Sequence, residues 1–86
     1  MVGYLCSMTW NESEGALRAD LMFADFAEAF AFMTRVGLIA QEQGHHPDMS
    51  ISWNRVTITI TTHDAGNTVT DKDRRLAAAI DATGAA

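Results

Sequence analysis

The chain has 86 residues, of which 48% are hydrophobic and 20% charged, a balance typical of one small globular domain spanning 1–86. Six basic residues against eleven acidic ones give a net charge of −5, which argues against a nucleic-acid partner held through phosphate contacts. No apolar stretch approaches the roughly 20 residues needed to cross a bilayer, and the N-terminus has no export signal. The single cysteine, Cys6, cannot form an internal disulfide. We therefore expect a cytoplasmic protein without a membrane partner.

A long helix is the clearest predicted element, and a less distinct pair of strands precedes it. Residues 8–10 and 16–23 carry enough apolar side chains for two strands, with the polar segment 11–15 as the turn between them. Asp25 is a suitable N-cap and Gly44 a suitable C-terminal end for a helix of about 18 residues. Spacings of four and three residues define one apolar stripe on this helix, which we expect to face the core: Phe26, Phe30, Met33, Gly37 and Ala40.

Alternation of apolar and polar residues predicts two further strands after Pro47, which prevents the helix from continuing. The first strand, over 49–53, ends with Trp53 on its inward side. The turn is expected at 54–55, and the second strand alternates inward β-branched residues with outward threonines over 56–61.

A last helix is predicted to begin after Thr70, which has the character of an N-cap with Asp73 three residues later. An apolar stripe over 76–80 follows, and Gly84 is expected to end the helix. The element order is therefore ββαββα. It predicts an α+β fold in which a four-stranded antiparallel sheet has the helices packed on one face.

The three histidines of the chain are close together in the sequence. His45 and His46 lie just beyond the first helix and before Pro47, where the partial negative charge of the helix C-terminus favours a protonated imidazole. His63 shares its strand parity with the outward threonines, so we expect its ring to lie away from the hydrophobic core. Three histidines at loop and strand ends indicate a functional site more than they indicate packing.

The spacing of these residues resembles the signature of the pterin-4a-carbinolamine dehydratase family. The shared pattern is His45-His46-Pro47, five residues to Trp53, nine more to His63, and an acid, Asp73, in the first turn of the last helix. The likeness extends along the long helix, the strand that follows Asn54 and the last helix.

The resemblance implies an antiparallel four-stranded sheet backed by helices, and a homodimer or homotetramer. It implies the dehydration of 4a-hydroxytetrahydropterin, such as 4a-hydroxytetrahydrobiopterin, to quinonoid dihydropterin without a metal or an organic cofactor. His45 and His63 would be the catalytic acid and base, and His46 a catalytic residue that also binds and orients the pterin. The implied substrate-binding residues are His46, Pro47, Trp53 and Asp73.

The chemistry of dehydration suits these residue types. The leaving hydroxyl needs a proton, and a ring N–H must lose one as the C=N bond forms, so an acid and a base should flank the ring. Imidazoles, with an unperturbed pKa near 6.5, can act as either at pH 7.

Several positions depart from the family pattern. Gln41 replaces an acid four residues before the first histidine, and the stretch from Asp64 to Lys72 is one residue longer than in the family. The N-terminal helix that many relatives carry is expected to be short or absent. Two assignments stay open: Trp53 is either a core or rim aromatic or a wall of the pterin pocket, and Asp73 is either a supporting acid or only a capping residue.

Two other functions remain as alternatives to the dehydratase. The first is a catalytically weak or inactive family member that acts as an oligomeric binding or assembly factor, such as a Rubisco assembly factor or a dimerisation cofactor. The second is a metal site made of the three histidines and an acid, because imidazole and carboxylate groups are zinc ligands. The presence of all three histidines favours the enzyme.

Overall fold

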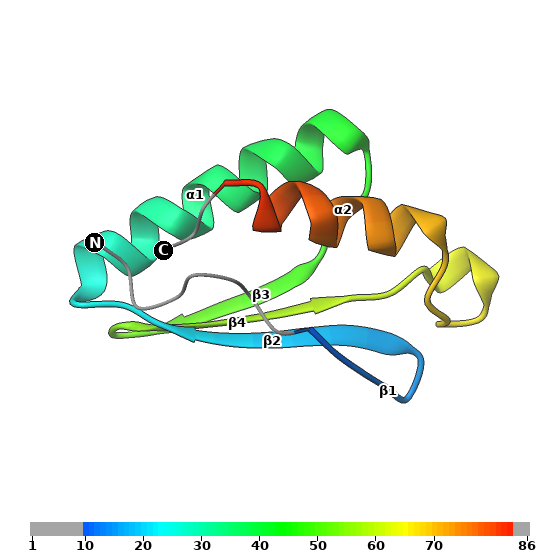
Figure 1. Cartoon of the computed structure of the whole chain (residues 1–86), viewed down its shortest axis with the longest axis horizontal. Coiled ribbons are helices and arrows are strands. Elements are labelled where there is room, and N and C mark those ends of the chain that lie inside the picture. The colour runs from blue at the N-terminus through cyan, green and yellow to red at the C-terminus, as the bar shows by residue number, and fades with distance from the viewer. Residues whose placement is uncertain (1–9, 84–86) are drawn as a thin grey trace.

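The computed structural model describes residues 10–83, which form an antiparallel sheet with two helices on one of its faces (Figure 1). The elements in chain order are β1 (Asn11–Ser13), β2 (Ala16–Met22), α1 (Phe26–Gln43), β3 (Asp48–Ser52), β4 (Arg55–Ile60), the 3₁₀ helix η1 (His63–Ala65) and α2 (Asp71–Asp81). The predicted ββαββα order and the α+β class are therefore confirmed.

The sheet has the strand order β1-β2-β4-β3, and every neighbouring pair is antiparallel. In the two central strands, β2 and β4, successive pairs of residues point alternately to the buried face and to the outer face of the sheet. Leu21 pairs with Val56 and both are buried beneath the helices, whereas the next pair, Asp20 and Thr57, lies on the opposite face. The core therefore lies between the sheet and the two helices.

The first hairpin begins later than predicted. β1 occupies residues 11–13, which the sequence assigns to the turn, and the turn itself is only Glu14 and Gly15, with φ angles of 50° and 78°. Two left-handed residues in succession make a tight turn that suits the twist of a hairpin. β1 is short, polar and exposed at the sheet edge, so it lacks the alternation of apolar and polar residues by which a strand is predicted from sequence. Trp10 precedes the strand, and residues 8 and 9 lie outside the described residues.

The predicted ends of α1 are confirmed. The Asp25 side chain accepts a hydrogen bond of 2.9 Å from the backbone N–H of Glu28, and this bond satisfies one of the free donors at the helix start. At the other end Gly44 has a φ of 67°, a left-handed conformation that glycine adopts without steric cost.

The predicted core face of α1 is wrong for its first turns. Phe26 and Phe30 are 48% and 54% exposed, and their rings stack on each other with a centroid distance of 5.8 Å. The helix carries a second apolar stripe, displaced by about a quarter-turn, and packing selects that one. Its buried members are Ala29, Phe32, Val36 and Ala40.

The turn between β3 and β4 also differs from the prediction. Ser52 pairs with Arg55, so the turn consists of Trp53 and Asn54, one residue earlier than expected. Trp53 has a φ of 53° and is 67% exposed, so its predicted inward position is wrong. The reason is that strand alternation stops at Ser52. Asn54 accepts a bond of 2.8 Å from the N–H of Phe23 and donates one of 2.9 Å to its carbonyl, which holds the turn beside the end of β2.

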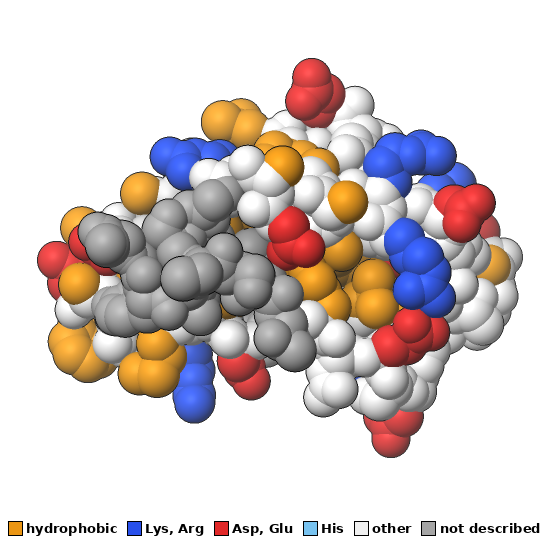
Figure 2. Space-filling view, in the orientation of Figure 1, with side chains coloured by type: hydrophobic (Ala, Val, Ile, Leu, Met, Phe, Trp, Pro, Cys, Tyr) orange, Lys and Arg blue, Asp and Glu red, His pale blue; other side chains and the backbone are white. Residues whose placement is uncertain are grey.

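Large apolar side chains are exposed where this turn meets the start of α1. We call this region the apolar end, and it consists of Met22, Phe26, Phe30 and Trp53. Figure 2 shows hydrophobic side chains at the left, where Figure 1 places the start of α1 and the β3–β4 turn, and further ones near the centre of the view. Charged side chains of both signs predominate at the right of the same view.

The start of α2 follows the prediction, and its end does not. Thr70 is the N-cap, and Thr70 and Asp73 form a capping box. Leu76 and Ile80 are fully buried against the sheet and α1. The helix ends at Asp81 with Ala82 as its C-cap, before Gly84, which lies outside the described residues. Within residues 10–83, neither helix has the length and apolar character required to cross a membrane.

Candidate active site

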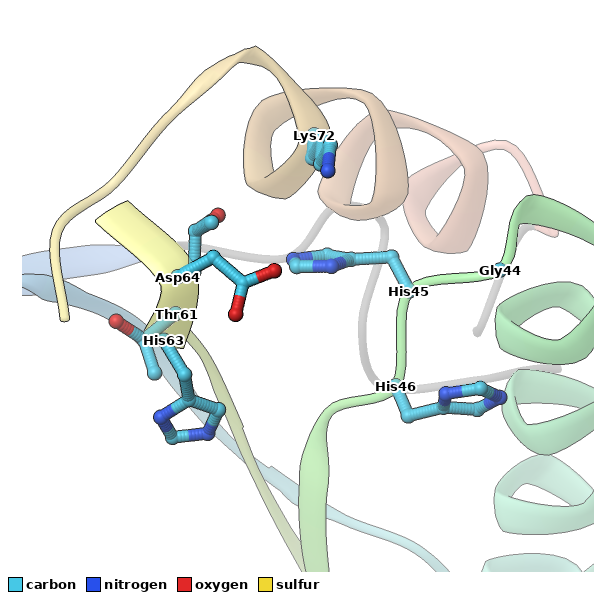
Figure 3. A pocket seen from close by; sticks show the side chains of 8 residues that line it. Gly44, His45, His46, Thr61, His63, Asp64 and Lys72 are labelled. Carbon is cyan, nitrogen blue, oxygen red and sulfur yellow. The ribbon is translucent and has the colours of Figure 1, made fainter. Parts of the chain in front are cut away.

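A cavity of about 260 Å³ opens where α1 ends and α2 begins (Figure 3). Gly44 makes this possible, because its left-handed conformation turns the chain and brings the next residues back toward the sheet. The backbone N–H of His45 donates to the carbonyl of Ala40 at 3.2 Å and fixes that turn. We call the cavity the histidine pocket, and its lining residues are Gly44, His45, His46, Thr61, Thr62, His63, Asp64 and Lys72.

The three histidines reach this pocket from two segments. His45 and His46 project from the link between α1 and β3, and His63 projects from η1, which follows β4 (Figure 3). Asp64 enters from η1 and Lys72 from the first turn of α2. The structure thus gathers the predicted histidines around a single cavity.

His45 is bound to a buried carboxylate. Its Nε2 lies 2.7 Å from Oδ1 of Asp73, whose side chain has no exposed surface. A carboxylate accepts hydrogen bonds, so the Nε2–H of His45 donates and the ring is held in one orientation. Nδ1 is left as the ring nitrogen that can exchange a proton with a bound molecule. A protonated His45 forms an ion pair with Asp73.

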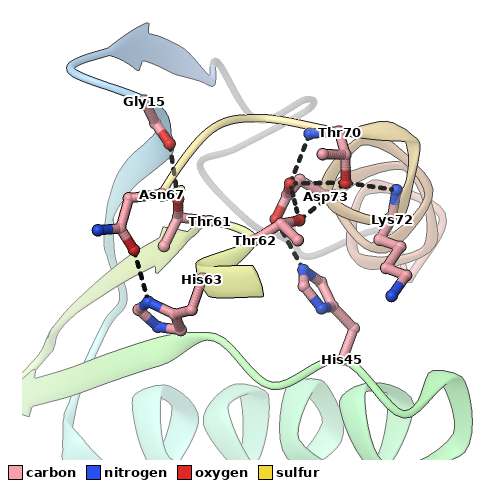
Figure 4. A network of polar contacts seen from close by, with 9 residues as sticks. All are labelled: Gly15, His45, Thr61, Thr62, His63, Asn67, Thr70, Lys72 and Asp73. Carbon is pink, nitrogen blue, oxygen red and sulfur yellow. Dashed lines mark hydrogen bonds and ion pairs between the residues drawn. The ribbon is translucent and has the colours of Figure 1, made fainter. Parts of the chain in front are cut away.

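The carboxylate of Asp73 also holds the start of α2 together (Figure 4). Its Oδ2 accepts bonds from the hydroxyl of Thr62 at 2.6 Å and from the backbone N–H of Thr70 at 2.7 Å. The Asp73 side chain therefore caps α2 and also contacts His45, so the geometry is compatible with both interpretations that the sequence left open. Asp73 is enclosed and is not among the residues that line the pocket, and its role in binding substrate stays a prediction.

The environment of Asp73 favours its ionised form. Burial by itself raises the pKa of this carboxyl group, but the hydrogen bonds from His45, Thr62 and Thr70 and the charge of a protonated His45 outweigh it, so the pKa is lowered overall. The ionised carboxylate is therefore held by three hydrogen-bond donors.

His46 has a different partner. Its Nε2 lies 3.0 Å from Oε1 of Gln41, an amide oxygen that only accepts, so the ring donates. Figure 3 shows the ring turned toward α1, away from His63. Gln41, near the C-terminal end of α1, therefore orients His46. The carboxylate that supports His45 comes from α2.

His63 is exposed at the opposite side of the pocket, as its parity predicted. Its Nδ1 lies 2.8 Å from Oδ1 of Asn67 in the loop that follows η1 (Figure 4). β4 ends at Ile60, so His63 belongs to a 3₁₀ turn and not to the strand. Thr61 and Thr62 bridge the two elements.

Pro47 and Trp53 do not line the pocket. Pro47 directly precedes β3, whose five residues, at roughly 3.3 Å each, separate it from Trp53. Trp53 lies at the apolar end, beyond the far end of β3. Its role as a pterin-binding residue stays a prediction. The distance of Trp53 from the histidine pocket within this chain does not support that role.

Besides Gly44 and Thr61, which also line the pocket, four residues that touch the site were not among the predicted site residues: Thr62, Asp64, Asn67 and Lys72. Only Thr62 gave a signal. It has the parity of the buried residues of β4, and a hydroxyl on the core side needs an internal partner. The other three depend on the path of the loop between η1 and α2, which no periodic pattern describes.

The pocket is equipped to move protons. It contains three imidazoles held in different ways, one by a carboxylate and two by neutral amides, with a carboxylate and an ammonium group beside them. Among residues 10–83, no group of three or more His, Cys, Asp or Glu side chains comes together in a way that could hold a metal ion.

Comparison with known proteins agrees with this geometry. The family model for pterin 4 alpha carbinolamine dehydratase matches residues 4–83. A protein of Synechococcus sp. (strain WH7803), provisionally named pterin-4-alpha-carbinolamine dehydratase, is 51% identical over 73 residues, which cover 85% of this chain and 77% of that protein. A protein of Rhodospirillum rubrum with the same provisional name is 53% identical over 73 residues, which cover 85% and 75%.

Solved structures show the same fold. The crystal structure of a transcriptional coactivator/pterin dehydratase from Brucella melitensis has a TM-score of 0.76 and 36% identity, covering 85% of this chain and 79% of that one. A pterin dehydratase-like protein identified as a RuBisCO assembly factor in the alpha-carboxysome has a TM-score of 0.70 at 23% identity, covering 91% and 89%, and its likeness concerns the fold alone. By the match over residues 4–83 and the identity to these relatives, the chain belongs to the pterin-4a-carbinolamine dehydratase family.

Proposed function

We propose that the protein is a 4a-hydroxytetrahydropterin dehydratase that works by histidine acid–base catalysis. His45 gives a proton to the hydroxyl on C4a, and the C4a–O bond breaks to release water. The ring nitrogen forms the C=N bond with C4a, and His63 takes the proton that this nitrogen loses. One water leaves, the two histidines have exchanged protonation states, and solvent restores them.

One observation carries this proposal: the two imidazoles are held by unlike partners. His45 donates to the buried carboxylate of Asp73 at 2.7 Å, a negatively charged acceptor that forms an ion pair with the ring when His45 carries the proton to be donated. His63 donates to the amide of Asn67 at 2.8 Å, so its ring is oriented by an acceptor that carries no charge. An acid and a base that face one cavity are what the reaction requires.

The other pocket residues have supporting roles in this proposal. His46, held by Gln41, orients the pterin and does not exchange the reacting protons. Asp64 and Lys72 line the cavity with opposite charges, and both can hydrogen-bond the polar edge of a pterin ring. The reaction needs neither a metal nor an organic cofactor.

A dehydratase assay on chemically generated 4a-hydroxytetrahydropterin tests the proposal directly. The enzyme-catalysed rate, corrected for the spontaneous reaction, is measured from about pH 5 to 9 in wild type, His45→Gln and His63→Gln. We expect a bell-shaped profile with limbs within a unit or two of about 6.5, which belong to the coupled pair of histidines. A wild-type rate equal to the spontaneous rate, or a flat profile between pH 6 and 8, contradicts the proposal.

We also propose that the protein forms a homodimer or homotetramer. A chain this short buries only a small core, and four large apolar side chains are 48–67% exposed at the apolar end. Sedimentation at micromolar concentration should give a mass above that of one chain, and a monomer mass throughout that range contradicts the proposal.

The apolar end is also the observation that favours a second candidate, a binding or assembly factor. The RuBisCO assembly factor in the alpha-carboxysome shares the fold, and the Brucella melitensis relative is described as a transcriptional coactivator as well as a pterin dehydratase. An oligomeric protein that shows no rate above the spontaneous reaction would move the function to this candidate.

A further inference from the structure

Asn67 is the hydrogen-bond partner of His63, and the direction of that bond is determined by its chemistry. Oδ1 of the amide lies 2.8 Å from Nδ1 of the imidazole. An amide oxygen accepts and does not donate, so the imidazole must carry its proton on Nδ1. In the neutral ring the lone pair is then on Nε2.

The backbone holds Asn67 firmly in this position. Its φ is 59°, a left-handed conformation that asparagine tolerates better than most residues. Its N–H donates to the carbonyl of Thr62 at 3.1 Å, which closes the loop around η1. The loop is further pinned at Thr62 and Thr68, which form an isolated β-bridge.

The turn between β1 and β2 supports Asn67 from the other side. Gly15 packs so closely against it that a Cβ on Gly15 would lie 2.0 Å from the Asn67 carbonyl oxygen. The hydroxyl of Thr61 donates to the carbonyl of Gly15 at 2.7 Å and ties this turn to the end of β4 (Figure 4). The backbone that carries the amide facing His63 is therefore held by contacts between segments far apart in the sequence.

We propose that Asn67 is a positioning residue that fixes the Nδ1–H tautomer of His63 and thereby presents Nε2 as the proton acceptor. The inference rests on the proposed dehydratase function for its catalytic consequence, and on geometry alone for the tautomer. Asn67 lies in the stretch between η1 and α2, whose path no periodic pattern describes.

The amide group suits this role better than a carboxylate would. A carboxylate on Nδ1 would fix the same tautomer but would also stabilise the imidazolium, and a base must be neutral to accept a proton. The carboxylate next in sequence, Asp64, points toward His45 in Figure 3. His63 is thus oriented by a group that adds no charge.

Two substitutions of Asn67 distinguish the effect of the hydrogen-bond acceptor on the His63 tautomer from the effect of a negative charge beside the ring. Asn67→Gly keeps the left-handed backbone and removes the acceptor. Asn67→Asp keeps an acceptor at the same place and adds a negative charge. The matched control is Thr68→Ala, which removes a side-chain bond of 3.1 Å to the carbonyl of Ala65 in the same loop and leaves the His63 contact intact.

The tautomer is measured from the ¹⁵N chemical shifts of the His63 ring above pH 8, and the catalytic consequence from the pH–rate profile. We expect wild type and Thr68→Ala to show the Nδ1–H form. Asn67→Gly should shift the ring toward the Nε2–H form and lower the turnover by about 10- to 100-fold.

Asn67→Asp should restore the Nδ1–H form and move the low-pH limb of the pH–rate profile to higher pH, because the new carboxylate favours the charged ring. The other titratable groups of the pocket, His45, His46, Asp64 and Lys72, are the same in all four proteins.

The two readouts distinguish this inference from the proposed function. His63 ring shifts that are the same in Asn67→Gly and wild type overturn the inference, whether or not the protein is active. A changed tautomer with unchanged turnover and pH profile overturns the catalytic half of it. A wild-type protein without dehydratase activity overturns the proposed function, and the ring shifts still decide whether Asn67 fixes the tautomer.

Discussion

The histidine pocket and the apolar end occupy opposite ends of β3 and are stabilised in different ways. At the pocket, polar side chains come from several segments, and each histidine has a named hydrogen-bond partner. At the apolar end, Phe26 and Phe30 stack on each other and remain half exposed, and Trp53 projects from a turn. The pocket is assembled by directional contacts within the chain, and the apolar end is left with hydrophobic surface that another chain can cover.

The comparison teaches that exposure has different meanings at the two ends. An exposed histidine such as His63 remains hydrated and able to exchange protons, so its exposure is compatible with chemistry. Contact between exposed phenylalanine rings and water is unfavourable in free energy, and these rings have no reactive group. Substitutions at the pocket should therefore change activity, and substitutions at the apolar end should change association.

The largest expected effect is that of His63→Ala on turnover. Loss of a general base should lower the dehydratase rate by about 10²- to 10⁴-fold. The unfolding free energy should change by less than about 0.5 kcal/mol, because the ring is exposed. Kinetics and urea unfolding of the same preparation check both. If the variant unfolds but its folded fraction has wild-type activity, His63 is structural and the contrast between the two ends fails.

Asp73→Asn should affect stability and activity together. The substitution leaves His45, Thr62 and Thr70 with a poorer partner in a buried place, at a cost of about 2 to 4 kcal/mol. Asp71→Asn is the matched control, since Asp71 is an exposed acid in the same first turn, and it should cost less than about 1 kcal/mol.

The effect of Asp73 should also depend on pH. Its pKa is lower in the folded than in the unfolded protein, so the ionised group stabilises the fold above about 3.9. This contribution is lost as the pH falls below that value and through the folded pKa. The difference in unfolding free energy between wild type and Asp73→Asn should therefore shrink on acidification. A difference that stays constant from pH 7 to 3 would contradict the assignment of an ionised Asp73.

Gly15→Ala tests how far the pocket depends on a turn outside it. The new Cβ would lie 2.0 Å from the carbonyl oxygen of Asn67, so the loop that holds His63 must move. We expect a loss of about 1 to 3 kcal/mol and reduced turnover. Gly66→Ala is the control, because Gly66 also has a positive φ, of 81°, but open space around its Cβ position. Equal effects of the two substitutions would show that backbone strain alone, and not contact with Asn67, is responsible.

Phe30→Ser should have the smallest effect on the folded chain. The side chain is 54% exposed and lies outside the core, so the stability of the isolated chain should change by less than about 0.5 kcal/mol. Sedimentation should show weaker association, whereas Phe30→Leu, which keeps an apolar side chain, should associate as wild type does. Unchanged association in Phe30→Ser would separate the apolar end from the oligomer.

Local sequence rules were sufficient for the order of the elements, for both ends of α1, for the start of α2 and for the alternation of β4. The ends of α1 at Asp25 and Gly44 and the start of α2 at Thr70 follow from hydrogen bonds between residues a few positions apart. The alternation that buries Val56 and exposes Arg55 follows from the two-residue period of a strand. These features need no knowledge of the rest of the chain, which is why the sequence by itself determined them.

Tertiary structure decided the features that depend on which surfaces meet. α1 has two apolar stripes, and periodicity cannot distinguish them, so only packing against the sheet shows that Phe32 is inside and Phe30 outside. The bond between His45 and Asp73 joins residues 28 positions apart, and the placement of Asn67 depends on contact with the β1–β2 turn. Trp53 belongs to a turn because the strand pairing ends at Ser52. Such contacts are set by the docking of whole elements, whose geometry a one-dimensional pattern does not contain.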